Sequence, residues 1–147
     1  YLTRAVREGR VYRVYGYKGK QVRDNCHAHD VCTAFQAFYE SPRRAAVYNL
    51  GGGRANSVSL LEAITALETL IDRPLKVEYV ETPRVGDHIC YISDLRRWKA
   101  DYPTWTITRS LDDILRELAG ASGAEAPGGS PRNARSRTPR RAAGPSR

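Results

Sequence analysis

Two arginines in separate segments are the side chains best suited to chemistry in this sequence. Arg23 precedes Asp24 and follows the strand-like residues KQV, and Arg84 opens the loop RVGD that ends at Asp87. Guanidinium groups form paired hydrogen bonds with phosphate oxygens, so two of them held together would suit a pyrophosphate. Asp87 could accept hydrogen bonds from sugar hydroxyl groups. The alternative is that both arginines form ordinary surface ion pairs, and spacing alone slightly favours it.

A second group of reactive side chains lies in the segment CHAH at positions 26–29, with Cys32 close by. Cys and His are zinc ligands, but these spacings match none of the common zinc modules. No Cys and His are spaced so as to mark a nucleophile and its base. No lysine stands four positions after a tyrosine, the arrangement of the acid/base pair in many dehydrogenases. We therefore expect neither a metal site nor a catalytic residue within the chain.

Three glycines at positions 51–53 follow an apolar run at 46–50. A strand, a glycine turn and a helix together are typical of a nucleotide-binding unit, whose fingerprint is G-x-G-x-x-G. Here Asn56 stands at the third glycine position, and the next helix is predicted to begin only near Ser59. The pattern therefore favours a turn that needs positive φ angles over a phosphate cradle.

The elements that must position these residues alternate between strands and helices, which indicates the α/β class. β-branched and apolar runs predict strands at 11–15, 46–50 and 76–80, with a short extended piece at 20–23. Apolar spacing and capping residues predict four helices. They begin at Asp30 (with Val31, Ala34, Phe35, Phe38 and Tyr39 on one face, ending at Ser41-Pro42), at Ser59 (ending at Arg73-Pro74), at Ser93 (with Leu95 and Trp98 on one face) and at Ser110 (ending at Gly120).

Charge is concentrated at the C-terminal end. The 147 residues include 24 Lys or Arg and 16 Asp or Glu, a net charge of +8. Residues 121–147 contain six arginines, one glutamate and no Val, Ile, Leu or aromatic residue. Such a segment cannot bury enough apolar surface to fold, so we expect a folded part at 1–120 and a disordered Arg/Pro/Gly/Ser/Ala-rich tail at 121–147. The alternative function is a non-catalytic basic protein whose tail binds a polyanion, but without interleaved aromatic residues a nucleic acid partner is not favoured.

Composition excludes several other classes. No apolar run approaches the about 18 residues of a membrane span, and the chain does not open on a charged and then apolar leader. Three cysteines cannot all pair with one another, so a reduced, cytoplasmic setting is the simpler interpretation. The chain contains no methionine and starts at Tyr1, which predicts that another segment precedes it.

Three blocks of sequence resemble one known family. They are GYKGKQVRDNCHAHDV at 16–31, VYNLGGGRANSVSLLEAI at 47–64 and PRVGDHICYISDLRRWKADYPTW at 83–105. In this order they resemble the C-terminal part of NAD-dependent nucleotide-sugar epimerases and dehydratases, the extended short-chain dehydrogenase/reductase family. Among these, the resemblance is closest to the CDP-paratose 2-epimerases, also called CDP-tyvelose epimerases.

The resemblance implies part of a Rossmann-type parallel sheet together with the smaller substrate-binding domain. It implies NAD as cofactor and a nucleotide-diphosphate sugar as ligand, with a sugar carbon oxidised and then reduced on its opposite face. A homo-oligomer is compatible with the full enzyme. The family's glycine motif and Tyr-x-x-x-Lys pair are absent from this sequence. We therefore expect a missing N-terminal NAD-binding half, and no activity from this chain alone.

The resemblance also implies roles for individual residues. Arg23 matches an arginine that contacts the substrate diphosphate, and Arg84 matches a second one. Asp87 matches a residue that binds the ribose hydroxyls of the nucleotide. Two further positions are implied: Asn49 near the substrate pocket, and Tyr15 or its neighbour Val14 beside the nucleobase.

Overall fold

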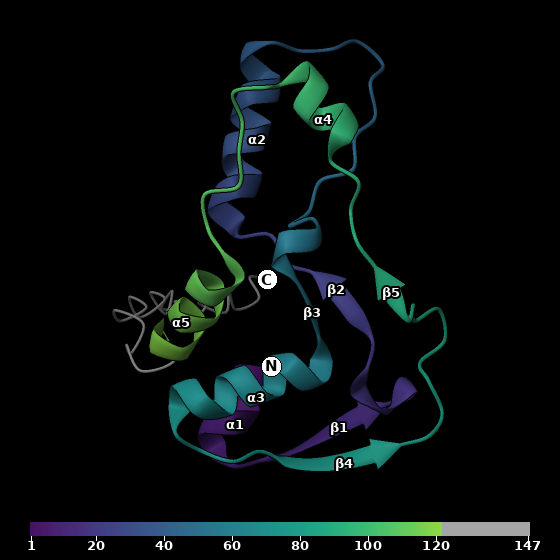
Figure 1. Ribbon diagram of the computed structural model, residues 1–147, viewed down its shortest axis with the longest axis vertical. Helices are drawn as coiled ribbons and strands as arrows, with labels where there is room; N and C mark the ends of the chain where they lie inside the picture. The colour runs from purple at the N-terminus through teal and green to yellow at the C-terminus, as the bar shows by residue number, and fades with distance from the viewer. Residues whose placement is uncertain (122–147) are drawn as a thin grey trace, which may run out of the picture.

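The structure is a computed structural model that describes residues 1–121 (Figure 1). The predicted tail lies outside the described residues from position 122 onward, and with it the polyanion-binding alternative. None of the helices within residues 1–121 combines the length and the apolar character needed to cross a membrane. Two regions are visible in Figure 1, a lower body around a pair of parallel strands and an upper region built on α2 and α4.

The lower body is organised around two parallel strands. β1 (Val11–Tyr15) pairs with β4 (Lys76–Val80) from one end to the other, which confirms both predicted strands. Helices α1 (Leu2–Glu8) and α3 (Leu60–Ile71) lie near one face of the pair, and α5 (Leu111–Ala121) packs beside α3 (Figure 1). The buried side chains of this body, including Leu75 just before β4, form one cluster, here called the aliphatic core: Ala5, Val6, Val14, Ile64, Leu67 and Leu75.

A small second sheet connects this body to the upper region. Its order is β3 (Ser57–Ser59), β2 (Val22–Asp24) and β5 (Cys90–Tyr91), with β2 antiparallel to β3 and parallel to β5. Two 3-10 turns flank it, at Tyr17–Gly19 and Arg54–Asn56. The extended piece predicted at 20–23 is thus found slightly later. β3 and β5 were not predicted because two or three residues are too few to show an alternating pattern.

The upper region is held by aromatic rings between α2 (Ala28–Glu40) and α4 (Arg96–Asp101). The ring of Trp98 stacks on Tyr102 with centroids 4.2 Å apart, and it meets Trp105 edge-on at 5.8 Å. Offset and edge-on arrangements are the favourable geometries for aromatic pairs. The buried members, here called the aromatic cluster, are Ala34, Leu95, Trp98, Tyr102 and Trp105.

The strand predicted at 46–50 is wrong. Residues 45–50 are irregular, and no strand among residues 1–121 lies alongside them to accept or donate backbone hydrogen bonds. Two residues of this run, Tyr48 and Leu50, pack against the aromatic cluster instead of pairing with a strand. Tyr48 donates a hydrogen bond to Asp101 at 2.7 Å and its ring lies 5.1 Å from that of Trp98. Leu50 packs against the same cluster.

The predicted start of the first long helix also needs correction. α2 begins at Ala28, where the His27 ring accepts a hydrogen bond from the His29 backbone at 3.0 Å. Asp30 is therefore inside the helix and fully buried. Its carboxylate accepts hydrogen bonds from the Thr108 backbone at 3.1 Å and hydroxyl at 2.6 Å, and from the Arg109 backbone at 3.2 Å. The residue that was expected to cap a helix instead fixes a distant loop.

The other three helices agree more closely with the sequence patterns. α3 carries the predicted capping box, in which Ser59 and Glu62 each accept from the other's backbone. α5 is capped in the same manner by Ser110 and Asp113, although it continues past Gly120. α4 begins at Arg96 rather than Ser93, and the Asp94 carboxylate accepts from the Arg96 backbone at 3.0 Å.

The three glycines at 51–53 form a turn packed against β2. Gly53 has a φ of 63°, the positive angle that the sequence predicted. A Cβ at Gly51 would collide with Ser93 and Asp24, and one at Gly52 would collide with the Asn25 carbonyl. The glycines thus allow the turn to pack closely against Asp24, Asn25 and Ser93, and the next helix does not begin until residue 60.

Candidate functional site

Arg23 and Asp87, which lie far apart in the sequence, form an ion pair. Arg23 is the middle residue of β2, and Asp87 lies in the loop between β4 and β5. The guanidinium Nη2 lies 2.5 Å from the carboxylate Oδ1, with 35% of the arginine and 22% of the aspartate side chain exposed. Nη1 also donates to the Val22 carbonyl at 2.7 Å. These contacts hold the Arg23 guanidinium in one place, as recognition of an anion requires.

Arg84 lies in the same loop and packs against an aromatic ring. The central carbon of its guanidinium is 5.0 Å from the ring centroid of Tyr15, which is the distance of a cation–π contact. Tyr15 is the last residue of β1, so the contact ties the loop to the end of the parallel strands.

A hollow of about 300 Å³, here called the arginine pocket, brings Arg23, Arg84 and Asp87 together. Two cations and one anion give this pocket an excess of positive charge, which suits a negatively charged ligand. Three of the five residues implied by the resemblance therefore converge, although their roles in binding stay predictions. The remaining lining residues are Leu2, Tyr12, Gln21, Asn25, Val58, Ser59, Leu60 and Ala63.

A second hollow adjoins the arginine pocket and shares Tyr12 and Arg84 with it. This tyrosine pocket has a volume of about 540 Å³ and contains Tyr15, the fourth predicted residue. Burial raises the pKa of Tyr12 above its ordinary value, against the opposing effect of Arg84. The full lining is Tyr1, Val11, Tyr12, Arg13, Tyr15, Glu78 and Arg84.

Gln21 is a site residue that the sequence patterns did not reveal. It lines the arginine pocket, and its Nε2 donates to the Tyr15 carbonyl at 3.4 Å. Its Oε1 is buried and has no hydrogen-bond partner within residues 1–121. A buried acceptor without a partner is costly, so Gln21 leaves one unsatisfied polar atom beside the pocket. In the sequence its only signal is its position two residues before Arg23.

Asn49 lies elsewhere. It is exposed in the irregular connection before the glycine turn and lines neither pocket. Its assignment to the substrate stays a prediction that depends on the resemblance alone.

The CHAH segment has structural roles instead. His27 caps α2 and its Nε2 lies 3.0 Å from a carboxylate oxygen of Glu117. Burial, followed by the nearby charges of Asp30 and Asp24, raises the pKa of the Cys26 thiol, which is the opposite of nucleophile activation. Within residues 1–121, no three His, Cys, Asp or Glu side chains gather as a metal ion would require.

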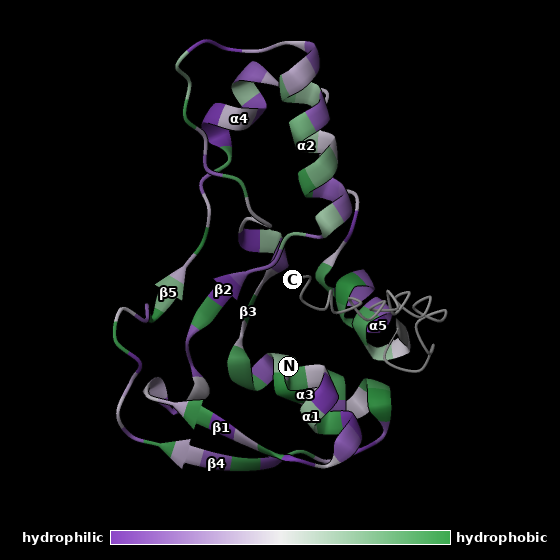
Figure 2. Ribbon diagram, turned by 180° about the vertical axis from the view of Figure 1, so that it is seen from behind, coloured by the Kyte–Doolittle hydropathy of each residue, from purple (hydrophilic) through white to green (hydrophobic). Residues whose placement is uncertain are grey.

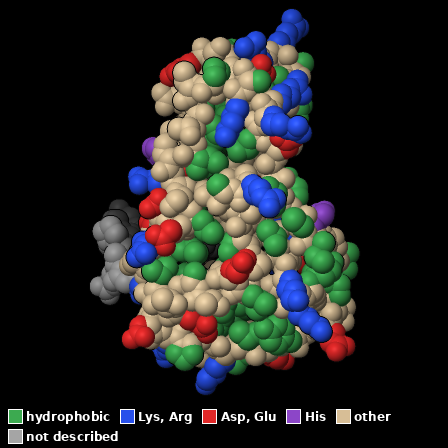
Figure 3. Space-filling view, in the orientation of Figure 1, with side chains coloured by type: hydrophobic (Ala, Val, Ile, Leu, Met, Phe, Trp, Pro, Cys, Tyr) green, Lys and Arg blue, Asp and Glu red, His purple; other side chains and the backbone are tan. Residues whose placement is uncertain are grey.

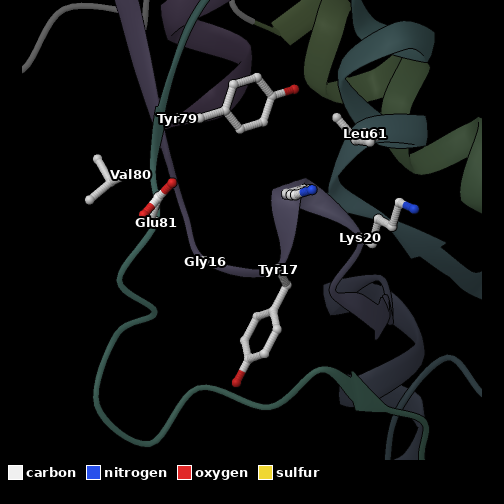
Figure 4. A pocket seen from close by; sticks show the side chains of 8 residues that line it. Gly16, Tyr17, Lys20, Leu61, Tyr79, Val80 and Glu81 are labelled. Carbon is white, nitrogen blue, oxygen red and sulfur yellow. The ribbon is translucent and has the colours of Figure 1, made fainter.

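A larger hollow of about 870 Å³ opens at the carboxyl ends of β1 and β4 (Figure 4). Figure 4 shows the Tyr79 ring pointing toward Leu61, while the Tyr17 ring points away from them. None of the predicted site residues lines it. Size alone therefore does not identify the functional site, and the smaller arginine pocket is the better candidate because its charged groups converge.

Comparison with known proteins agrees with this architecture. No protein-family model matches the sequence. The fold is similar to that of dTDP-glucose 4,6-dehydratase from Bacillus anthracis in complex with NAD, with a TM-score of 0.70 and 26% identity over 81% of this chain and 36% of that one. It is similar to MoeE5 in complex with UDP-glucuronic acid and NAD, with a TM-score of 0.71 and 27% identity over 82% and 40% of the two chains. It is also similar to a UDP-glucose 4-epimerase from Thermus thermophilus in complex with NAD, with a TM-score of 0.73 and 19% identity over 84% of this chain and 39% of that one.

These likenesses confirm the predicted fold class. The chain has an α/β fold similar to that of part of these nucleotide-sugar dehydratase and epimerase structures. NAD is present in all three of the solved structures. The chain spans at most 40% of their length.

Proposed function

We propose that this chain is the nucleotide-sugar-binding portion of an NAD-dependent nucleotide-sugar epimerase. The observation that carries the proposal is the convergence of Arg23, Arg84 and Asp87 on one pocket. Residue chemistry and the family resemblance predict the same three residues as diphosphate and ribose ligands. The fold likeness to proteins that bind UDP-sugars supports the same assignment.

In this proposal Arg23 from β2 and Arg84 from the loop between β4 and β5 both bind the diphosphate. Each guanidinium can donate two parallel hydrogen bonds to phosphate oxygens. Asp87 pairs with Arg23 and keeps that guanidinium beside the pocket. When a nucleotide occupies the pocket, the Asp87 carboxylate is the acceptor for the ribose hydroxyls. Gln21 adds an uncharged polar side chain to the same wall.

We assign the sugar chemistry to epimerisation at C2 of a CDP-sugar through a transient keto sugar, as in the CDP-paratose 2-epimerases that the sequence resembles. NAD and the acid/base pair belong to a further NAD-binding half, because this sequence lacks the family's glycine motif and its Tyr-x-x-x-Lys pair. Two exposed aromatic residues one helical turn apart on α2 support such a half, since Phe35 is 65% and Tyr39 85% exposed. By itself the chain is expected to bind the nucleotide without turning it over.

Calorimetric titration of the chain with CDP and UDP tests the site. Arg23→Ala and Arg84→Ala should each weaken binding about tenfold or more, because charge-assisted hydrogen bonds contribute roughly 1.5–3 kcal/mol each. Lysine at either position should restore only part of the affinity, since an ammonium cannot form the planar fork. The matched control is Arg44→Ala, an exposed arginine that lines neither pocket, which should leave affinity unchanged. Wild-type affinity in both site variants would overturn the assignment.

A further inference from the structure

A second group of arginines lies at the opposite end of the lower body from the arginine pocket. Helices α1 and α3 pack together and α5 packs beside α3 (Figure 1). The C-terminal ends of these three helices border a hollow of about 670 Å³, here called the helix-end pocket. Its charged lining residues are Arg7, Arg73, Arg116 and Asp72. Three cations and one anion give this pocket an excess of positive charge.

The helix-end pocket shares no residue with the arginine pocket. Leu2 and Leu60, at the starts of α1 and α3, line the arginine pocket. Arg7 and Ile71, at the ends of the same two helices, line the helix-end pocket. The 12 residues of α3 span about 18 Å at about 1.5 Å per residue. A diphosphate in the arginine pocket therefore cannot reach the second group of arginines.

Two of these arginines are fixed by backbone carbonyls at the helix ends. Arg7 Nη2 donates to the Ala119 carbonyl of α5, and Arg73 Nη1 donates to the Arg7 carbonyl of α1. Gly9 leaves room for the Arg73 side chain, since a Cβ at this glycine would lie 2.8 Å from Arg73 Nη2. Helix C-termini carry partial negative charge, so these contacts also stabilise the packing of the helices.

The three guanidinium groups hold more donors than the protein uses. Each guanidinium carries several N–H donors in a fixed fork. Arg116 pairs through Nε with Asp112 Oδ2 at 2.6 Å, and its two Nη atoms have no hydrogen-bond partner within residues 1–121. No aromatic side chain of the described residues lines the pocket, so none is present to stack on a base. The lining therefore suits phosphate groups but not a nucleobase.

We propose that Arg7, Arg73 and Arg116 form a second anion site, which binds a small ligand through two or more phosphate groups and does not contact its organic part. Inorganic pyrophosphate is the simplest member of this class. The site lies outside the nucleotide-sugar site and does not depend on it. If the arginines served the helix ends alone, replacing them would change stability and leave anion binding unchanged.

Calorimetric titration of the full chain with inorganic pyrophosphate tests the second site. The background is the double variant Arg23→Ala/Arg84→Ala, which removes both guanidinium groups of the arginine pocket. This variant should bind one pyrophosphate, and binding should raise its melting temperature. Arg116→Gln or Arg73→Gln in this background should weaken binding roughly three- to tenfold, because a charge-assisted hydrogen bond is lost at a partly exposed position. Thermal melting of each variant shows that it is folded.

Arg4→Gln is the matched control. Arg4 is exposed and pairs with a carboxylate four positions away on its helix, as Arg116 does, but it lines neither the arginine pocket nor the helix-end pocket. Its replacement should leave pyrophosphate binding unchanged. Asp112→Asn should tighten binding, because it removes a carboxylate that competes for Arg116.

CDP distinguishes a phosphate site from a second nucleotide site. In the background variant, CDP and pyrophosphate should bind with similar affinity, since the base adds no contact. Tighter binding of CDP, equal pyrophosphate affinities in Arg4→Gln and Arg116→Gln, or no pyrophosphate binding by the background variant would each overturn the proposal. Any of these results would leave the arginine pocket and the proposed function in place.

Discussion

The aliphatic core and the aromatic cluster are built in different ways. The aliphatic core lies between regular elements, with a continuous parallel pair of strands near two helices. The aromatic cluster lies between one long helix, one short helix and irregular segments. Figure 2 shows hydrophobic and hydrophilic residues mixed along α2. In Figure 3 hydrophobic side chains reach the surface of both regions.

This difference shows how an irregular region can be held in place. Where no strand pairing is present, individual polar side chains form hydrogen bonds with the backbone instead. Asp30 holds the loop at Thr108 and Arg109, and the buried Asn56 donates to the Arg109 carbonyl at 2.8 Å and accepts from the Leu111 backbone at 3.1 Å. Asp24 accepts from Gly53 at 2.9 Å and from Ser93 at 3.0 Å. In the arginine pocket, strand pairing fixes Arg23 on β2, whereas Asp87 is held by its ion pair with Arg23 and Arg84 lies against the Tyr15 ring.

Loss of the central ring should produce the largest effect on stability. Trp98 is 4% exposed and its ring contacts those of Tyr48, Tyr102 and Trp105. Trp98→Ala should lower the free energy of unfolding by about 3–5 kcal/mol, measured by urea denaturation with circular dichroism. Trp98→Phe should cost clearly less, because it keeps a ring and removes a buried N–H that has no partner within residues 1–121. Equal losses from the two variants would show that ring packing is not what holds this region.

A cavity in the aliphatic core should show whether the two regions unfold together. Leu67 is 2% exposed, and Leu67→Ala should cost about 2–5 kcal/mol. Both tryptophans of the sequence, Trp98 and Trp105, belong to the aromatic cluster, so tryptophan fluorescence reports on that region alone. We expect the fluorescence transition to shift together with the circular dichroism transition, since polar contacts connect the regions. A fluorescence midpoint that stays at its wild-type value would instead show two independent units.

Removing the charge of Asp30 should have a smaller effect that depends on pH. Burial opposes ionisation of this carboxyl, but the hydrogen bonds from Thr108 and Arg109 outweigh burial and lower its pKa below the ordinary value. A lowered pKa in the folded state means stabilisation that is present above the unfolded pKa of about 3.9 and is lost as pH falls through the folded value. Asp30→Asn should cost about 1.5–3 kcal/mol at pH 7.

The pH dependence provides the check on this prediction. The difference between wild type and Asp30→Asn should shrink as thermal melts are repeated from pH 5 down to acid conditions. Asp112→Asn, at an exposed carboxylate paired with Arg116, is the control and should cost little at any pH. A constant gap between Asp30→Asn and wild type over this range would contradict the role of the charge.

Local patterns in the sequence were sufficient for the lower body. The strands at 11–15 and 76–80 and the capping box of Ser59 and Glu62 depend on residues within a few positions of each other, and all were found where predicted. The sequence also identified Arg23, Arg84 and Asp87 as candidates. This was possible because the hydrogen-bonding chemistry of a guanidinium, and that of a carboxylate, does not depend on the fold. The resemblance to known motifs gave these residues their expected roles.

Tertiary structure decided everything that depends on a distant partner. The run at 46–50 has the composition of a strand, but a strand forms only where another backbone lies beside it, and Tyr48 and Leu50 pack on aromatic rings instead. Asp30 is a residue type that often caps helices, but its carboxylate accepts hydrogen bonds from a loop 78 positions away instead. Only the fold placed Gln21 in the arginine pocket and Arg13 opposite Glu78, because strand register cannot be read from either strand alone.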